Sequence, residues 1–188
     1  QGEFTFIVGE NGAGKTTLMR MINVSENVSS GKLFVDGVDI EEIDPIQQRQ
    51  DFLLCGQSVY LFKGTIVDNF QKFYELRGLE SPSIEKINEF VKLVVLDYDA
   101  STKVDSMSGG ERQRVYLAIF ISLAQKVIML DEPTSALDDA SAKGLMTNLK
   151  AYAKENNLSV IIVSHAKNLV EEFADSVVDL SNVKRGEF

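Results

Sequence analysis

The chain has 188 residues, of which 44% are hydrophobic and 25% charged, as in an ordinary globular domain that can bury a sizeable core. Its net charge of −9 argues against non-specific binding to nucleic acid, and no apolar run reaches the roughly 18 residues that a membrane-spanning helix needs. The single cysteine, Cys55, excludes an internal disulfide, and its apolar neighbours predict a buried and unreactive thiol.

Apolar runs alternate with segments of helical periodicity along the chain. The expected strands are Phe4–Val8, Lys32–Val35, Phe52–Leu54, Val127–Leu130, Val160–Val163 and Val177–Leu180. The expected helices are Lys15–Val24, Ile84–Val95, Glu111–Ala124, Ala140–Asn156 and Lys167–Ala174. The last four strands are nearly continuous in apolar residues, as strands buried on both faces are. The alternation predicts an α/β fold with a mostly parallel sheet flanked by helices.

The middle of the chain, residues 58–110, lacks long apolar strands. It contains Pro82 and a helical pattern in which Ile84, Ile87, Val91 and Val94 share one face. We therefore expect one domain whose core, residues 1–57 and 111–188, is interrupted by a largely helical subdomain.

A glycine-rich loop with the pattern G-x-x-x-x-G-K-T lies between the first expected strand and the first expected helix. Glycines let backbone N–H groups turn inward on a phosphate, and the helix that follows adds its positive dipole end. Lys15 would reach the β- and γ-phosphates, and the Thr16 hydroxyl could ligate Mg²⁺. The alternative is a capped helix after flexible glycines, which leaves the strand–loop–helix context unexplained. The expected nucleotide-binding residues are Gly9, Glu10, Asn11, Gly12, Ala13, Gly14, Lys15, Thr16 and Thr17.

An apolar strand near residue 130 ends in two carboxylates, Asp131 and Glu132, which Pro133 follows. Asp131 could hold Mg²⁺ directly or through water, and Glu132 could polarise an attacking water. The alternative is a strand that happens to end in an acidic turn. Because a phosphate-binding loop is present in the same chain, we favour the metal and water roles.

Two further features are candidates for contact with an anion. Ser108, Gly109 and Gly110 stand at the start of an expected helix, where they form either a second anion site or a capped surface helix. The only histidine, His165, follows an expected buried strand. Ligands of open α/β sheets lie at such carboxyl ends, so we favour a role in the site over a structural one.

Together these motifs resemble the ATP-binding cassette (ABC) ATPase family. Residues 107–111 resemble its L-S-G-G-Q signature, with Met107 in place of Leu and Glu111 in place of Gln. The resemblance covers essentially the whole chain and implies a P-loop NTPase core with a reduced antiparallel β-subdomain. The family's adenine-stacking aromatic lies upstream of the phosphate-binding loop. Since this chain begins at Gln1, we expect an N-terminally trimmed cassette.

The resemblance also implies roles for single residues. Glu132 would orient or deprotonate water, His165 would contact the γ-phosphate as the switch histidine, and Gln57 would be the Q-loop glutamine near Mg²⁺ or the attacking water. The implied metal ligands are Thr16, Gln57 and Asp131. Two cassettes would pair head to tail, and ATP on the loop of one would be closed over by Ser108, Gly109 and Gly110 of the other.

These roles imply an ATP hydrolase that needs ATP and Mg²⁺, with a second cassette and a transporter's transmembrane domain as partners and no nucleic acid. It would be cytoplasmic and peripheral on the inner face of the cell membrane. The segment that begins at Leu61 resembles that of exporter-type cassettes, in which Tyr60, Leu61 and Phe62 would be an apolar landing site rather than buried core. Two alternatives are a soluble non-transport ABC ATPase, acting in translation, repair or assembly, and a regulatory module that binds nucleotide without hydrolysis.

Overall fold

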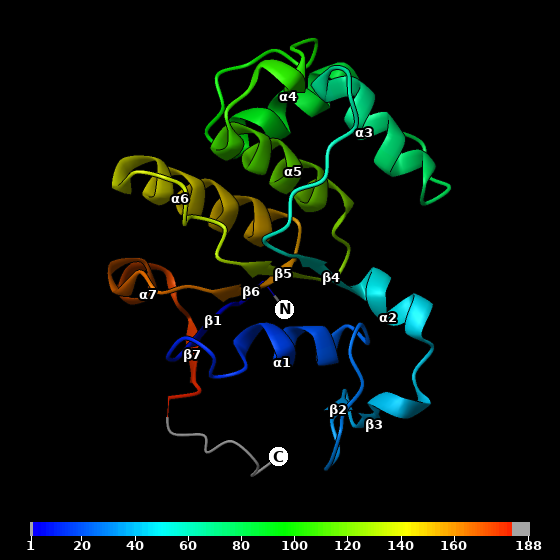
Figure 1. The fold of residues 1–188 in the computed structure, drawn as a ribbon, viewed down its shortest axis with the longest axis vertical. Coiled ribbons are helices and arrows are strands. Elements are labelled where there is room, and N and C mark those ends of the chain that lie inside the picture. The colour runs from blue at the N-terminus through cyan, green and yellow to red at the C-terminus, as the bar shows by residue number, and fades with distance from the viewer. Residues whose placement is uncertain (1, 182–188) are drawn as a thin grey trace. The chain divides into compact units, whose positions relative to one another are not determined.

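The computed structural model describes residues 2–181, and it confirms a mixed α/β architecture (Figure 1). The strands are β1 (Phe4–Val8), β2 (Phe34–Val35), β3 (Val38–Asp39), β4 (Phe52–Cys55), β5 (Val127–Asp131), β6 (Ser159–Val163) and β7 (Ser176–Asp179). The α-helices are α1 (Lys15–Ile22), α2 (Pro45–Asp51), α3 (Ile66–Glu75), α4 (Ile84–Leu93), α5 (Gly109–Leu123), α6 (Asp139–Glu155) and α7 (Lys167–Phe173). Short 3-10 helices cover Ile40–Glu42 and Val104–Ser106.

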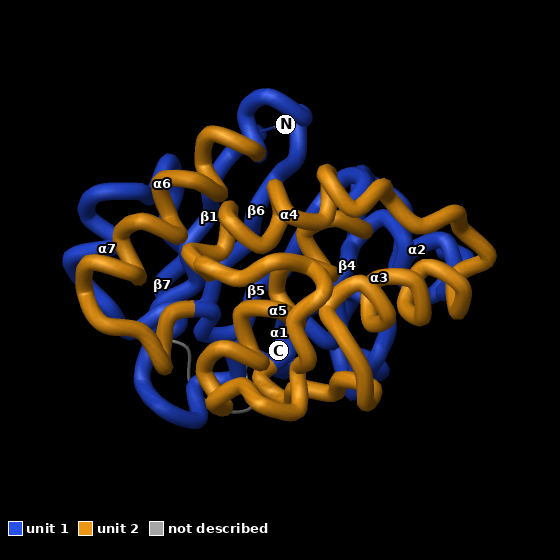
Figure 2. The backbone as a smooth tube through the Cα atoms, turned by 90° about the horizontal axis from the view of Figure 1, so that it is seen from above, with its two compact units in different colours: residues 1–56, 124–133, 153–188 blue, residues 57–123, 134–152 orange. Residues whose placement is uncertain are grey.

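The chain divides into two compact units (Figure 2). The first comprises residues 1–56, 124–133 and 153–188, and the second comprises residues 57–123 and 134–152. All strands of the main sheet belong to the first unit. The expected division into a core of residues 1–57 and 111–188 and a subdomain of residues 58–110 stays a prediction. Among residues 2–181, no helix combines the length and the apolar character needed to cross a bilayer.

The first unit is built on a parallel five-stranded sheet in the order β4-β5-β6-β1-β7. Helix α1 packs on it through Met19, which belongs to a buried cluster with Ile7, Met129 and Val163. Since all strands run the same way, the carboxyl ends of β1, β5 and β6 share one edge of the sheet. The segments that follow these three strands are therefore gathered at that edge.

The expectation that the last strand is buried on both faces is wrong. Strand β7 stands at the end of the sheet order, and Val177 and Val178 are 50% and 42% exposed. An edge strand has a neighbour on one side only, so its apolar residues are less covered than those of central strands. The apolar run marked the strand but not its position in the sheet.

The small antiparallel sheet of β2 and β3 confirms a reduced antiparallel part of the fold. Asp36 and Gly37, both with positive φ, make the turn between its strands, as two-residue hairpins require. Helix α2, which the sequence analysis did not predict, provides side chains that hydrogen-bond carbonyl groups at the carboxyl end of α1. Gln48 donates to the Ile22 carbonyl at 2.7 Å, and Arg49 donates to the Val24 carbonyl at 2.8 Å.

The second unit is largely helical. Helix α3, also not predicted, begins with a capping box between Thr65 and Asp68. In α4 and at its C-cap, Ile87, Val91 and Val94 are buried as expected, but Ile84 is 54% exposed and Phe90 is buried instead. Helix α5 is buried on more than one face, because Leu117 and Ile121 lie in the core together with Val115, Ala118 and Ile119.

Candidate functional site

The loop between β1 and α1 depends on glycine at defined positions. Gly9, Gly12 and Gly14 have φ values of 148°, 82° and 93°, a region that residues with a Cβ rarely adopt. At Gly9 space is limiting too, because an added Cβ would lie 3.3 Å from Leu180 Cβ and 3.4 Å from Ala13 Cβ. At Gly14 an added Cβ would meet no atom within 4 Å. The glycines therefore set the curl of the backbone that the sequence pattern predicted.

Lys15, the first residue of α1, is only 7% exposed and carries its ammonium back over this loop. Its Nζ donates to the carbonyl oxygens of Gly9 and Glu10, at 2.9 Å in each case. A buried ammonium needs such partners, since leaving a charge without hydrogen bonds in the interior is costly. The loop thus holds a cation against its own backbone at the N-terminal end of a helix.

Thr16 and Asp131 come from distant parts of the sequence and meet at the edge of the sheet. The Thr16 hydroxyl donates to Asp131 Oδ2 at 2.8 Å, and Asp131 is only 4% exposed. The other carboxylate oxygen, Oδ1, is buried and has no hydrogen-bond partner among the described residues. A buried oxygen without a partner is unfavourable unless something else satisfies it.

This oxygen pair fits a Mg²⁺ ion, which prefers hydroxyl, carboxylate and phosphate oxygens and keeps several water ligands. Residues 2–181 hold no group of three or more His, Cys, Asp or Glu side chains that could bind a metal by itself. A metal here would therefore depend on Asp131, Thr16 and oxygens from a bound ligand. That is the coordination expected for Mg²⁺ carried by a nucleotide.

Glu132 and His165 face each other at the same edge of the sheet, after the carboxyl ends of β5 and β6. Glu132 adopts a φ of 53°, and its N–H donates to the Val163 carbonyl at 3.0 Å, which ties the turn to the end of β6. Its Oε1 lies 3.3 Å from His165 Nε2, and both side chains are partly exposed. Strain of this kind in a residue other than glycine is found at functional sites.

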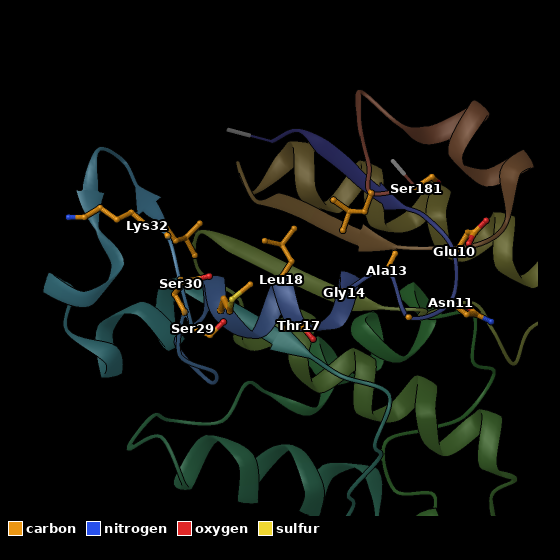
Figure 3. Close-up of a pocket in the computed structure, with 16 residues that line it drawn as sticks. Glu10, Asn11, Ala13, Gly14, Thr17, Leu18, Ser29, Ser30, Lys32 and Ser181 are labelled. Atoms are coloured by element: carbon orange, nitrogen blue, oxygen red, sulfur yellow. The ribbon is translucent and has the colours of Figure 1, made fainter. Parts of the chain in front are cut away.

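A pocket of about 810 Å³ opens beside the loop and runs along α1 (Figure 3). Figure 3 shows Glu10, Asn11 and Ala13 at one end, and Ser29, Ser30 and Lys32 at the other. Its apolar lining was not predicted, because it joins segments distant in sequence that only the fold brings together. The apolar lining residues are Ala13, Leu18, Met21, Val28, Leu33 and Leu180.

The remaining candidates lie in the second unit. Gln57 is exposed and follows Gly56 two residues beyond Cys55, the last residue of β4. Ser108, Gly109 and Gly110 form the start of α5, where an added Cβ on Gly110 would lie 3.6 Å from the Ala136 carbonyl oxygen. The first unit thus brings together the loop, Asp131, Glu132 and His165. The roles of all these residues, and of Gln57 and the start of α5, stay predictions.

Comparison with known proteins gives one consistent result. The family profile described as ABC transporter matches residues 1–135. Methionine import ATP-binding protein MetN 1 of Oceanobacillus iheyensis is 33% identical over 189 residues, 98% of this chain and 56% of that protein. Probable iron export ATP-binding protein FetA of Escherichia coli is 31% identical over 179 residues, 95% of this chain and 79% of that protein.

A solved structure shows the same fold. The ATP-binding cassette MJ0796, a dimer in a post-hydrolysis state bound to ADP and Pi, is 26% identical, with a TM-score of 0.79. The match covers 96% of this chain and 82% of that one. The chain spans little more than half the length, 56%, of the methionine import protein. On these matches and the site geometry, the chain belongs to the ABC transporter family.

Proposed function

We propose that the first unit binds ATP with Mg²⁺ and hydrolyses it, as the nucleotide-binding part of a transporter. The observation that carries the proposal is the contact between Thr16 and Asp131 Oδ2, with the buried Oδ1 of the same carboxylate left without a partner. This pair lies next to Lys15 at the start of α1. A loop, a cation and an unsatisfied carboxylate oxygen in one place suit a magnesium-bound polyphosphate.

The loop residues bind the phosphates in this proposal. Backbone N–H groups from Gly9 to Thr17 surround the β-phosphate, and Lys15 exchanges its bonds to the Gly9 and Glu10 carbonyls for bonds to phosphate oxygens. Thr16 and Asp131 would hold Mg²⁺. When bound, the metal neutralises charge on the β- and γ-phosphate oxygens.

Glu132 and His165 act on water and on the transferred group. Glu132 accepts a proton from the attacking water or orients it, which is the task of a general base at the end of a strand. His165, whose Nε2 lies 3.3 Å from Glu132 Oε1, donates to the γ-phosphate. Catalysis then rests on positioning and charge stabilisation more than on covalent chemistry.

A second copy of the cassette, or a related one, completes the site. The Ser108 hydroxyl and the backbone N–H groups of Gly109 and Gly110 lie at the start of α5. In the closed pair they bind the γ-phosphate of the ATP held by the partner copy. ATP then favours the closed state because it binds that state better than the open one.

The transmembrane domain of a transporter binds the second unit, and the cassette is peripheral on the cytoplasmic face of the membrane. Tyr60 is 62% exposed and packs edge-on against Phe62, with ring centroids 5.0 Å apart. Asn69, which is fully buried, bonds both the N–H and the carbonyl of Phe62 and so fixes this segment. An exposed aromatic on a hydrogen-bonded segment suits a docking surface, and the segment favours an exporter-type partner.

The relatives' names include both an importer and an exporter component, so they do not distinguish between an importer and an exporter for this chain. They favour transport over the soluble, non-transport cassette. Recovery of the protein with a membrane protein from solubilised native membranes, and loss of that protein in the Tyr60→Asp variant, supports transport. Recovery with ribosomes or DNA instead contradicts it.

The decisive test of hydrolysis is Glu132→Gln. Removing a general base is expected to lower phosphate release by roughly 10²–10⁴-fold while ATP is still bound. The matched control is Glu171→Gln on the exposed surface of α7, which should leave turnover unchanged. Near-normal turnover of the Glu132 variant rejects the assignment of this residue, and failure of the wild-type protein to bind ATP rejects the proposed function itself.

A further inference from the structure

The carboxylate of Glu111 places a negative charge in the first turn of α5. Glu111 Oε2 accepts hydrogen bonds from both the N–H and the hydroxyl of Ser108, each at 2.7 Å. In return, the Glu111 N–H donates to Ser108 Oγ at 3.3 Å. This reciprocal pair occupies both groups of Ser108 that could donate to a phosphate.

Tyr98 holds the same carboxylate from the other side. Its hydroxyl donates to Glu111 Oε1 at 2.8 Å, so both oxygens of Glu111 are engaged. The bonds from Ser108, and secondarily those from Tyr98 and the charge of Arg114, lower the pKa of Glu111 below its ordinary value. The side chain is therefore ionised at neutral pH. An ordinary helix cap needs only the bonds to Ser108, since a cap acts on the N–H groups of the first turn.

We propose that Glu111, fixed by Tyr98, is a positioning residue that competes with the γ-phosphate for Ser108 and so raises the threshold for ATP-driven pairing of two cassettes. This inference rests on the proposed function. A hydroxyl has one hydrogen, so Ser108 donates either to the carboxylate or to a phosphate oxygen. Because a charged acceptor binds that hydrogen more tightly than a neutral one, the carboxylate is a stronger competitor than a glutamine amide would be.

The proposed competition for Ser108 concerns the start of α5 only. The start of another helix, α4, provides a matched comparison. Glu85 lies in the first turn of α4 behind the cap residue Ser83, and its pKa is also lowered, by its own backbone N–H and by Ser83. It is exposed and shares with Glu111 the charge and the position near a helix N-terminus. A general effect of removing such a charge should appear at both residues, whereas competition for Ser108 should appear only at Glu111.

The experiment measures self-association with ATP and Mg²⁺ by sedimentation, in a Glu132→Gln background that prevents hydrolysis. Glu111→Gln should lower the dissociation constant of the ATP-bound pair by about fivefold or more, a size typical of coupling between sites. Tyr98→Phe should give a smaller change of the same sign, because the carboxylate keeps its bonds to Ser108 but loses its anchor. The control Glu85→Gln should leave the constant unchanged.

A double-variant cycle tests whether Glu111 acts through Ser108. In a Ser108→Ala background, Glu111→Gln should give no gain, since the hydroxyl for which it competes has been removed. A full gain in that background, or a change within about twofold for Glu111→Gln alone, overturns the inference. Binding of a fluorescent ATP analogue to the dilute single chain is measured separately. If that binding is normal, a negative result concerns Glu111 only; if it is missing, the proposed function has failed first.

Discussion

Lys15 is the residue whose surroundings most constrain what the loop can bind. It is nearly buried, yet its only described hydrogen bonds are to the Gly9 and Glu10 carbonyls, which a phosphate group can replace. Lys15→Ala should weaken ATP binding by about tenfold or more, because hydrogen bonds to charged groups contribute about 1.5–3 kcal/mol each. Titration with a fluorescent nucleotide measures the change.

The control for this variant is Lys126→Ala. Lys126 pairs with Asp51 on the surface of the same unit, with Nζ 2.6 Å from the carboxylate. Surface pairs of this kind contribute little, so its removal should leave nucleotide affinity unchanged. Equal affinity of the wild-type protein and the Lys15 variant would show that the ammonium does not reach the ligand.

Cys55 allows a test of packing at the end of β4, close to the site. It is buried, and burial together with the nearby charge of Asp131 raises the pKa of its thiol to about 12. Because the thiolate is the reactive form, a disulfide reagent should react at pH 8 only as fast as the protein opens. The rate should rise to that of a free thiol when urea unfolds the chain.

The raised pKa of Cys55 also has a consequence for stability. The folded state favours the protonated thiol, so this contribution is complete below the ordinary pKa of 9.0. It is lost progressively as the pH rises from there toward 12, because only the unfolded chain then ionises freely. Rapid reaction of Cys55 in the folded protein at pH 8 would contradict both the burial and the shift.

At the scale of elements, the glycine-rich loop predicts two unequal substitutions. Gly14→Ala meets only the backbone cost of positive φ, about 1–2 kcal/mol. Gly9→Ala has a similar backbone cost and also brings a Cβ to 3.3 Å from Leu180 and 3.4 Å from Ala13. Such crowding adds about 1–3 kcal/mol. Urea unfolding of the two variants should therefore rank Gly9→Ala as the less stable, and the reverse order would mean that the close contacts relax without cost.

The helices show how much of the secondary structure the sequence could predict. For helices with long periodic runs, the predicted ends lie within a few residues of the observed ends. Helix α5, for example, was expected at Glu111–Ala124 and is observed at Gly109–Leu123. Helices α2 and α3 were missed although each has a readable start, Pro45 after Asp44 in one and the Thr65–Asp68 capping box in the other. Helix α2 is short, and its apolar residues are too few to produce a strong period. In α3, however, Ile66, Phe70 and Phe73 are spaced for one helical face, so its sequence did carry a readable period.

The site could be predicted only as separate motifs. The loop, the acidic pair after β5 and the histidine after β6 each carry a local pattern, and a parallel sheet places such strand ends at one edge. The Thr16–Asp131 bond, the pair formed by Glu132 and His165, and the tie from Tyr98 to Glu111 depend on tertiary distances. No spacing in the sequence encodes those distances, so they had to come from the structure.

At the scale of the whole molecule, the proposed function makes activity depend on two chains. The loop with Asp131 and the start of α5 with Ser108 belong to different compact units, and in the proposal each ATP is held by these parts of two copies. A site shared between copies is populated only to the extent that the copies are associated, which depends on their concentration. Turnover per chain should therefore rise with protein concentration and level off once pairing is complete.

A dilution series over a roughly hundredfold range, with phosphate release measured at saturating ATP and Mg²⁺, checks this dependence. Ser108→Ala should shift the rise to higher concentration, because it removes a γ-phosphate contact from the partner copy while leaving the loop intact. The control Ser141→Ala removes a hydroxyl whose described bond is to Asp138 near the start of α6. If turnover per chain is constant across the series, a single copy already contains the complete site. The role proposed for the start of α5 would then be wrong, even with the loop and Glu132 correctly assigned.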